Sequence, residues 1–313
     1  MSSSRCGHQP ARRLGWAATA YHKQEVVNPD PVPRKHCLLN DGRPDERFGV
    51  RLCTWNVGSL SGRGTEVCEE LRKRRADVCC LQEVRWRGQG ARFLGAKGRR
   101  YKLWWSGNSE GTGGVGVLVK EELCEKVVEV LRKSDRVMTV VMAFEEEVVR
   151  ILCAYGPQSG RTSAEKERFY DELASEWDKK NAGELVLGLG DFNGHVGKRI
   201  EGYEGVHGGF GIGERNMEGR MLLEFCDEKE LCVANTWFQK GEKRKVTYSA
   251  GGNETEIDFV LVGQGERKLL RDVKVVPGEL QHRLVVADLV KKGEKGGEKG
   301  SFQEKEGLEI ERR

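Results

Sequence analysis

The chain has 313 residues, enough for one large domain with a sizeable core. Hydrophobic residues make up 37% and charged residues 33%, and no run approaches the 18 or so apolar residues of a membrane-spanning helix, so a membrane protein is not expected. The net charge of +4 lies mostly on residues 1–48, which contain 8 Lys and Arg but only 5 Asp and Glu. The rest of the chain is close to neutral, so its composition gives only weak support for a polyanionic partner such as nucleic acid.

Residues 1–48 are predicted to form a disordered arm. They hold five of the seven prolines and show no sustained hydrophobic periodicity. The basic start of the chain has no continuous apolar segment, so we expect no secretory signal, although a mitochondrial presequence is not excluded. The ten cysteines form no C-x-x-C pair, which favours a reduced, intracellular protein. We expect it in the nucleus.

From Val50 onward the sequence changes to short apolar runs. They are rich in β-branched residues and are bounded by glycine or charged clusters, which is typical of buried strands. The predicted strands are VRLCTW (50–55), VCCLQE (78–83), VGVLV (115–119), VMTVVMAF (137–144), VVRILCAY (148–155), ELVLGLGDF (184–192), LCVAN (231–235), IDFVLV (257–262) and LVVADL (284–289).

Three helices are predicted between these strands. The clearest covers 163–179, where Phe169, Leu173 and Trp177 recur every four residues and Thr162 with Glu165 forms a capping-box pattern. The others cover 66–75 and 218–229. Many strands with single helices between them predict two packed sheets with helices on the outside, in one domain over 49–290. Residues 291–313 are predicted to be a charged, low-complexity tail.

Polar residues that can bind metal or transfer protons follow or open several of these strands. Because strand ends can converge from distant parts of a sequence, they are candidates for one site. Each is a weak signal alone, since such residues are most often turn, loop or solvated residues. They are Asn56, Glu83, Tyr155, Asp191, Asn193, Asp258 and His282.

The order of these motifs is more specific than any one of them. WN, QE, AYGP, GDFN, N-x-x-GR-x-L-x-EF, TY, IDFV and a final His resemble the motif series of the endonuclease/exonuclease/phosphatase superfamily, over residues 50 to 290. The resemblance implies an α+β fold, a four-layer α/β/β/α sandwich of two packed, mostly antiparallel sheets with helices outside. It also implies a metal-dependent phosphodiester hydrolase.

A narrower resemblance lies in EFCDEKELCVANTWFQKGEKRKVTYSAGGNETEIDFVLV and VVPGELQHRLVVADL. These segments resemble the endonuclease of RTE-type non-LTR retrotransposons and the craniofacial development protein 2-like chains related to it. We therefore expect a DNA-nicking endonuclease of retrotransposon origin, with duplex DNA bound through its backbone. No reverse transcriptase follows in this chain, so a domesticated or truncated copy is expected.

The chemistry of phosphodiester hydrolysis assigns a metal site and a base. Glu83 is the candidate ligand of Mg²⁺, with Mn²⁺ as a possible substitute, and Asn56 would support it through a neutral oxygen. Asp191 would orient and deprotonate the attacking water, and Asn193 would hold the phosphate or the attacking oxygen.

The resemblance adds a His–Asp pair and several phosphate contacts. His282 would face the scissile phosphate with its tautomer fixed by Asp258, and Tyr155 would donate to the phosphate. Asn216 is a candidate for phosphate or DNA contact, and the alternative is that it forms the N-cap of the helix over 218–229. The basic run that contains Arg85 and Arg87, and continues with Arg92, Arg99 and Arg100, is a candidate DNA-binding segment or a solvated loop.

Two positions depart from the pattern of many relatives. Gly58 and Gln281 stand where those relatives have Asp, so one metal ion rather than two is expected. Two alternatives remain open. One is a catalytically weak or inactive DNA- or chromatin-binding protein; the other is a phosphatase acting on inositol phosphates or lipids, which is disfavoured because TEIDFVLV replaces the P-x-W-C-D-R stretch of those phosphatases.

Overall fold

The structure is a computed structural model that describes residues 48–145, 147–278 and 280–290. The predicted tail lies outside these residues, as does the predicted arm apart from Phe48. A seven-stranded sheet has the order β14 (Leu270–Val275), β15 (Val285–Val290), β1 (Phe48–Asn56), β2 (Val78–Gln82), β5 (Val115–Lys120), β4 (Tyr101–Ser106) and β3 (Gln89–Leu94).

A six-stranded sheet packs against it. Its order is β10 (Leu231–Val233), β13 (Asp258–Gly263), β9 (Leu185–Asp191), β8 (Val148–Tyr155), β7 (Val137–Ala143) and β6 (Val127–Arg132). A small hairpin joins β11 (Tyr248–Ala250) to β12 (Asn253–Thr255). Among the strands described in the two large sheets, only β1–β2 and β8–β9 pair in parallel. Both parallel pairs have their carboxyl ends at the candidate site.

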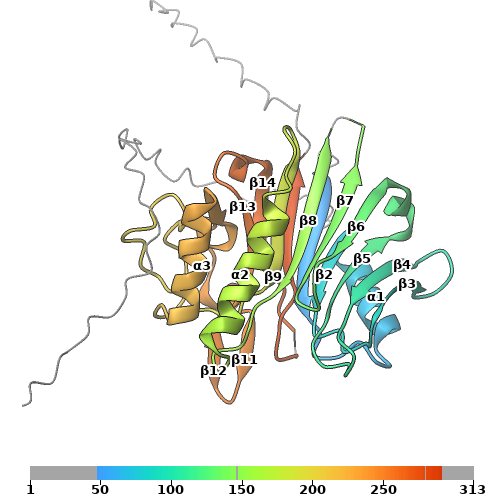
Figure 1. The fold of residues 1–313 in the computed structure, drawn as a ribbon, viewed down its shortest axis with the longest axis horizontal. Helices are drawn as coiled ribbons and strands as arrows, with labels where there is room; N and C mark the ends of the chain where they lie inside the picture. The colour runs from blue at the N-terminus through green and yellow to red at the C-terminus, as the bar shows by residue number, and fades with distance from the viewer. Residues whose placement is uncertain (1–47, 146, 279, 291–313) are drawn as a thin grey trace, which may run out of the picture. The chain divides into compact units, whose positions relative to one another are not determined.

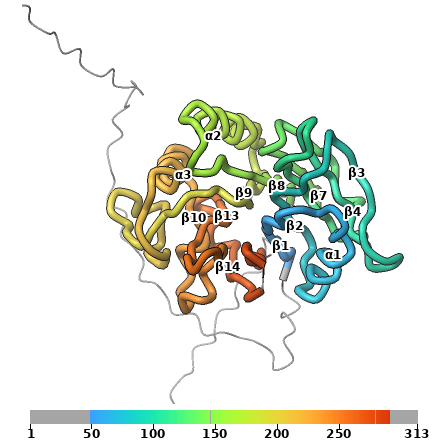
Figure 2. Tube along the Cα trace, turned by 90° about the horizontal axis from the view of Figure 1, so that it is seen from below, coloured from blue at the N-terminus to red at the C-terminus, as the bar shows by residue number. Residues whose placement is uncertain are grey.

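Among the residues that the structure describes, three α-helices cover the outer faces of the sheets: α1 (Gly64–Lys73), α2 (Ser163–Trp177) and α3 (Met217–Glu228). Apolar side chains of both sheets form one core between them, with Leu52, Val140 and Leu187 among its members. A second core lies under α2 and α3, and a third under α1. Figures 1 and 2 show α1 on one side of the sheets and α2 and α3 on the other. The expected four-layer α/β/β/α sandwich is therefore confirmed.

The predicted helices begin and end within two residues of the observed ones. Thr162 caps α2 as the sequence predicts, because its hydroxyl accepts from the Glu165 N–H and the Glu165 carboxylate accepts from the Thr162 N–H. Phe169, Leu173 and Trp177 are buried on one face of α2. In the described part of the chain, no helix combines the length and apolar character needed to cross a bilayer.

Candidate functional site

Four strand ends bring the predicted polar residues together. Asn56 ends β1 and Glu83 follows β2 in one sheet, while Tyr155 ends β8 and Asp191 ends β9 in the other. Because β1–β2 and β8–β9 are parallel pairs, their carboxyl ends lie at the same edge of each sheet. Asn56 connects the two sheets, since its side-chain nitrogen donates to Glu83 Oε1 at 3.2 Å and to Asp191 Oδ2 at 2.9 Å.

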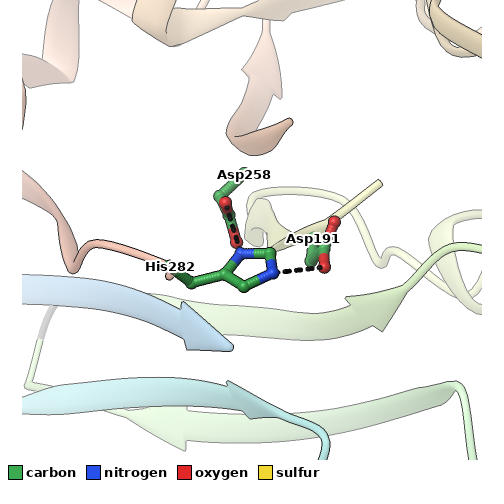
Figure 3. Close-up of side chains that lie close together, drawn as sticks. All are labelled: Asp191, Asp258 and His282. Carbon is green, nitrogen blue, oxygen red and sulfur yellow. Dashed lines mark hydrogen bonds and ion pairs between the residues drawn. The ribbon is translucent and has the colours of Figure 1, made fainter. Parts of the chain in front are cut away.

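The His–Asp pair completes the site. Asp258 opens β13 and lies opposite Asp191 in the register of β13 with β9. His282 approaches from the segment before β15: its Nδ1 is 3.1 Å from Asp258 Oδ2 and its Nε2 is 3.8 Å from Asp191 Oδ2. Figure 3 shows the imidazole between the two carboxylates. The predicted partner of His282 is thus in hydrogen-bonding contact with it.

The electrostatics of this group favour a charged imidazole. Burial alone would lower the pKa of His282, but the charge of Asp258 and its hydrogen bond outweigh burial and raise the pKa to about 9. His282 therefore keeps its second proton at neutral pH. An imidazolium has no lone pair for a metal, so this histidine is suited to stabilise negative charge.

The surroundings of Asp191 disfavour its charged form, in contrast to those of His282. It is only 1% exposed, and burial, followed by the nearby charge of Asp258, raises its pKa to about 7. The Asn56 amide and the Asn193 N–H, which donates to Asp191 Oδ1 at 3.0 Å, favour the ionised form. A carboxyl group that titrates near neutrality is suited to accept a proton from water.

Glu83 lies beside Asp191 and His282, and both of its carboxylate oxygens accept hydrogen bonds. Tyr155 donates its hydroxyl to Glu83 Oε1 at 3.0 Å, and Arg85 donates to Oε2 at 2.5 Å. Burial opposes ionisation of Glu83, but its hydrogen bonds with Arg85, Asn56 and Tyr155 outweigh burial and lower the pKa. Glu83 therefore carries a full negative charge at neutral pH, as a ligand for a hard cation must.

The carboxylates of the site fit a divalent cation. Asp258 Oδ1 is buried and has no hydrogen-bond partner, and it belongs to a group in which ligand atoms of Asp191, Asp258 and His282 lie within 4.8 Å of one another. Because His282 is protonated, only the two carboxylates of this group offer oxygen ligands to a cation. Asn56 turns its nitrogen toward Glu83 and Asp191, while its oxygen accepts from the Gly58 N–H. Because this oxygen is already engaged by the backbone, the role of Asn56 as an oxygen ligand stays a prediction.

Asn193 lies in the turn that follows β9, beside the candidate site. Its φ of 51° is left-handed, which asparagine tolerates better than most residues. Its side-chain nitrogen donates to the Gly156 carbonyl at 3.0 Å, so the turn after β9 is tied to the end of β8. The turn thus holds Asn193 two residues from Asp191, with its amide next to the strand ends that carry the other site residues.

Asn216 is the N-cap of α3. Its side-chain oxygen accepts from the Gly219 N–H at 2.8 Å and from the His195 N–H at 2.9 Å. The capping interpretation of Asn216 is therefore confirmed, and its contact with phosphate or DNA stays a prediction.

Replacing Asn216 by alanine should lower the free energy of unfolding by about 1–2 kcal/mol, because it removes both of these bonds. Urea unfolding would measure the loss, with Thr162→Ala at the cap of α2 as the matched control. If DNA affinity falls for Asn216→Ala but not for Thr162→Ala, Asn216 also contacts DNA; equal affinities would make that predicted contact wrong.

The two arginines predicted to bind DNA have different surroundings. Arg85 has a φ of 55° and forms an ion pair with Glu83, so it lies at the site itself. Arg87 is exposed, and its carbonyl accepts from the Trp105 indole at 3.4 Å. Gly58 and Gln281 are also exposed, and neither residue type has a carboxylate that could bind a metal.

Two residues at the site were not singled out from the sequence, although the TY motif contains them. The Thr247 hydroxyl accepts from the Ile257 and Asp258 N–H groups at 2.9 and 3.1 Å, which fixes the start of β13. The Tyr248 ring lies 4.7 Å from the His282 ring, and the two residues form an isolated β-bridge. Thr247 and Tyr248 therefore hold the two members of the His–Asp pair in place.

Comparison with known proteins agrees with this geometry. A sequence profile of the Endonuclease/Exonuclease/phosphatase family matches residues 53–279. Craniofacial development protein 2 of Bos taurus is 27% identical over 241 residues, which cover 75% of this chain and 40% of that protein. The protein of the same name from Tragulus javanicus is 26% identical and covers 75% and 41%. The chain thus spans about two fifths of the length of these relatives.

Solved structures share the fold. The endonuclease domain of TRAS1, a telomere-specific non-LTR retrotransposon, has a TM-score of 0.52 and 15% identity, over 77% of this chain and 98% of that one. The 3'-5' exonuclease NExo from Neisseria meningitidis has a TM-score of 0.55 and 18% identity, over 77% and 100%. The catalytic domain of Xenopus laevis APE2 has a TM-score of 0.55 and 16% identity, over 78% and 94%.

These identities are too low to transfer an activity, but the family profile covers most of the described domain. The resemblance predicted from the order of the motifs is confirmed at the level of the family, as is the narrower resemblance to craniofacial development protein 2. The chain belongs to the Endonuclease/Exonuclease/phosphatase family.

Proposed function

We propose that this protein is a divalent-metal-dependent phosphodiester hydrolase that nicks duplex DNA, an endonuclease of retrotransposon origin. The observation that carries the proposal is the position of His282 between Asp258 and Asp191, next to the ionised Glu83. The segment before β15 supplies an acid, His282, the end of β9 a base, Asp191, and the residue after β2 an anionic ligand, Glu83; Asn56 contacts both of these carboxylates. That is the set of groups that metal-assisted phosphodiester hydrolysis requires.

In the proposed mechanism, Asp191 accepts the proton of the attacking water, because its pKa of about 7 lets it be ionised at working pH and still bind a proton. His282 remains protonated through its contact with Asp258 and stabilises the charge that develops on the phosphate. Asp191 and His282 titrate as a coupled pair, since only 3.8 Å separates their nearest atoms.

Glu83 would hold the metal ion, which we propose to be Mg²⁺ with Mn²⁺ as a substitute. When bound, the ion polarises a phosphoryl oxygen. Asn56 and Tyr155 already hold Glu83 Oε1, so they fix the carboxylate in one orientation. Tyr155 and Asn193 have side chains at the same strand ends, where we propose that they contact the phosphate.

Duplex DNA is the proposed substrate on two grounds. The TRAS1 domain is an endonuclease of a retrotransposon, and a NExo variant from Neisseria was solved bound to a product DNA hairpin. The second candidate function is a DNA-binding protein of retrotransposon origin with little or no catalysis. The absence of a carboxylate at Gly58 and Gln281 favours it, because both positions lie next to site residues.

The test is nicking of supercoiled plasmid by the full chain with Mg²⁺, with Mn²⁺ and with EDTA. We expect open-circle product with either ion and none with EDTA. Binding of the same plasmid without nicking under every divalent ion would contradict the enzyme and favour the DNA-binding protein.

Replacing Gln281 by aspartate should tighten Mg²⁺ binding by a factor on the order of 10, because it adds an anionic oxygen beside His282 at an exposed position. Calorimetry would measure the affinity, and Gln239→Asp is the matched control. Gln239 is also exposed but neighbours Lys240, which pairs with Asp272 on β14. Equal affinities for Gln281→Asp and the wild type would show that Gln281 does not border the metal.

A further inference from the structure

A surface of tryptophan and arginine side chains begins three residues after Glu83. The Trp86 and Trp105 rings are 5.1 Å apart and meet edge to face at 88°. The Arg92 guanidinium lies 5.4 Å from the centre of the Trp86 ring. Both tryptophans are half-buried, and Arg92 is exposed. We call this surface, made of Trp86, Arg87, Gly90, Arg92 and Trp105, the tryptophan edge.

Gly90 is required for this arrangement. It lies opposite Trp105 in the register of β3 with β4, and a Cβ at Gly90 would come within 2.3 Å of the indole ring. Only glycine therefore lets the Trp105 ring lie across β3. The ring is further held by the hydrogen bond from its nitrogen to the Arg87 carbonyl. Packing against Gly90 and this hydrogen bond therefore hold the Trp105 ring of the tryptophan edge in one position.

The tryptophan edge lies at the same end of the sheet as the candidate site. Through β4 and β5, the register places the first residue of β3, Gln89, at the level of Gln82, which precedes Glu83. Residues 84–88 connect Glu83 to β3, and the Arg85 N–H donates to the Gly113 carbonyl at 2.7 Å. Three strand spacings separate β2 from β3, which is about 14 Å.

The segment that carries the tryptophan edge is strongly basic. Residues 83–102 hold seven basic residues, and Glu83 is their only acidic residue. Arg100 is paired with Glu121. Within the part of the chain that the structure describes, Arg87 and Arg92 have no carboxylate within ion-pair distance. These two cations remain available to a polyanion, although the body of the chain is neutral overall.

We propose that the tryptophan edge binds the phosphate backbone of duplex DNA to one side of the bond that is cut, an inference that rests on the proposed function. A guanidinium stacked on an indole is pre-oriented, so less conformational entropy is lost when it binds phosphate. One strand carries a phosphate about every 3.4 Å along the helix axis, so 14 Å corresponds to about four phosphates from the site.

The same charges have a simpler explanation. In the described structure β3 is the outermost strand of its sheet, and exposed arginines on such a strand prevent pairing with another chain. That explanation does not require two tryptophans, a glycine that admits one of them, or an arginine stacked on the other. It also does not account for the location of the surface beside Glu83. These four features favour DNA.

The test compares the full chain with the double variant Arg87→Gln/Arg92→Gln. Affinity for a duplex of about 20 base pairs would be measured by fluorescence anisotropy in Ca²⁺ over a series of salt concentrations. We expect about tenfold weaker binding at low salt and a salt-dependence slope smaller by about 2, since each lost phosphate contact removes about 0.9. Thermal midpoints would verify that the variant folds.

Arg267→Gln is the matched control. Arg267 also stacks on a tryptophan, 3.8 Å from the Trp237 ring centre, but it lies in η4 (Arg267–Leu269), which follows the end of β13 opposite Asp258. We expect this variant to bind DNA like the wild type.

An unchanged slope in the double variant would overturn the inference. So would self-association of the double variant with normal DNA affinity, which would support the edge-strand explanation. A wild-type chain that binds the duplex but never nicks it would contradict only the proposed function. A lower slope in the double variant would then still support the tryptophan edge as a DNA-binding surface.

Discussion

Replacing Asp191 or His282 by alanine should lower the rate of DNA nicking by a factor on the order of 10² or more. In the proposed mechanism both groups act chiefly in the transition state, where Asp191 would receive a proton and His282 would face the developing charge. Affinity for DNA should change little, because Lys and Arg contacts to the backbone supply most of it. Nicking would be followed at matched salt and Mg²⁺ concentrations, and binding in Ca²⁺ to suppress turnover.

Asp191→Asn separates catalysis from folding. Burial raises the pKa of Asp191 from its usual 3.8 to about 7, so ionising it costs folding free energy as pH rises between these values. The amide variant should therefore be at least as stable as the wild type at pH 8 while its nicking rate falls. Asp178→Ala, which removes an exposed carboxylate paired with Lys229, is the control and should nick normally. Losses of only a few-fold for both Asp191 variants would contradict its role as the base.

The fold was predictable where strands are buried on both faces. Within the predicted runs, residues 78–81, 115–119 and 185–190 are apolar throughout because they lie between a helix layer and the opposite sheet. The strands β4, β6 and β14 were not predicted, although β4, YKLWWS, is largely buried. The strand β3, QGARFL, was not predicted either, because it lies at the edge of its sheet and most of its side chains are exposed. Strands with so few buried residues carry little hydrophobic pattern.

The clustering of the candidate site residues was predictable, but their contacts were not. The order of the motifs placed Asn56, Glu83 and Asp191 in one site, and the structure brings Asn56 within hydrogen-bonding distance of the other two. Nothing in the order of the motifs specifies that the Asn56 nitrogen bridges the two carboxylates, or that Arg85 pairs with Glu83. Such contacts depend on side-chain orientations that are set by packing between distant segments.

The contacts that hold the His–Asp pair in place were also not predictable from the order of the motifs. The sequence predicted that Asp258 orients His282, and the 3.1 Å contact agrees with it. The Thr247 hydroxyl and the Tyr248 ring come from a short hairpin whose strands have three residues each. The TY motif was visible in the sequence, but its roles follow from a β-bridge between segments 34 residues apart. Register across such a distance is not encoded in local periodicity.

Replacing Asp258 by asparagine should move the whole pH–rate profile of nicking toward lower pH. The proposed mechanism needs ionised Asp191 and protonated His282, so the wild-type profile should be bell-shaped, with limbs at about 7 and about 9. After burial, the charge of Asp258 is the largest influence on both pKa values, and it raises both. Removal of this charge should therefore move both limbs of the profile to lower pH.

The rate of Asp258→Asn near neutral pH should fall between those of the wild type and His282→Ala, because the imidazole remains but loses its charged partner. The raised pKa of His282 also stabilises the fold below its usual 6.5, and this contribution disappears as pH rises through about 9. The variant should lack this part of the pH dependence of unfolding. NMR titration of His282 in Asp258→Asn and in the wild type, beside the two pH–rate profiles, would test both statements. An upper limb that stays in place while the pKa of His282 falls would show that His282 is not the group whose protonation limits nicking.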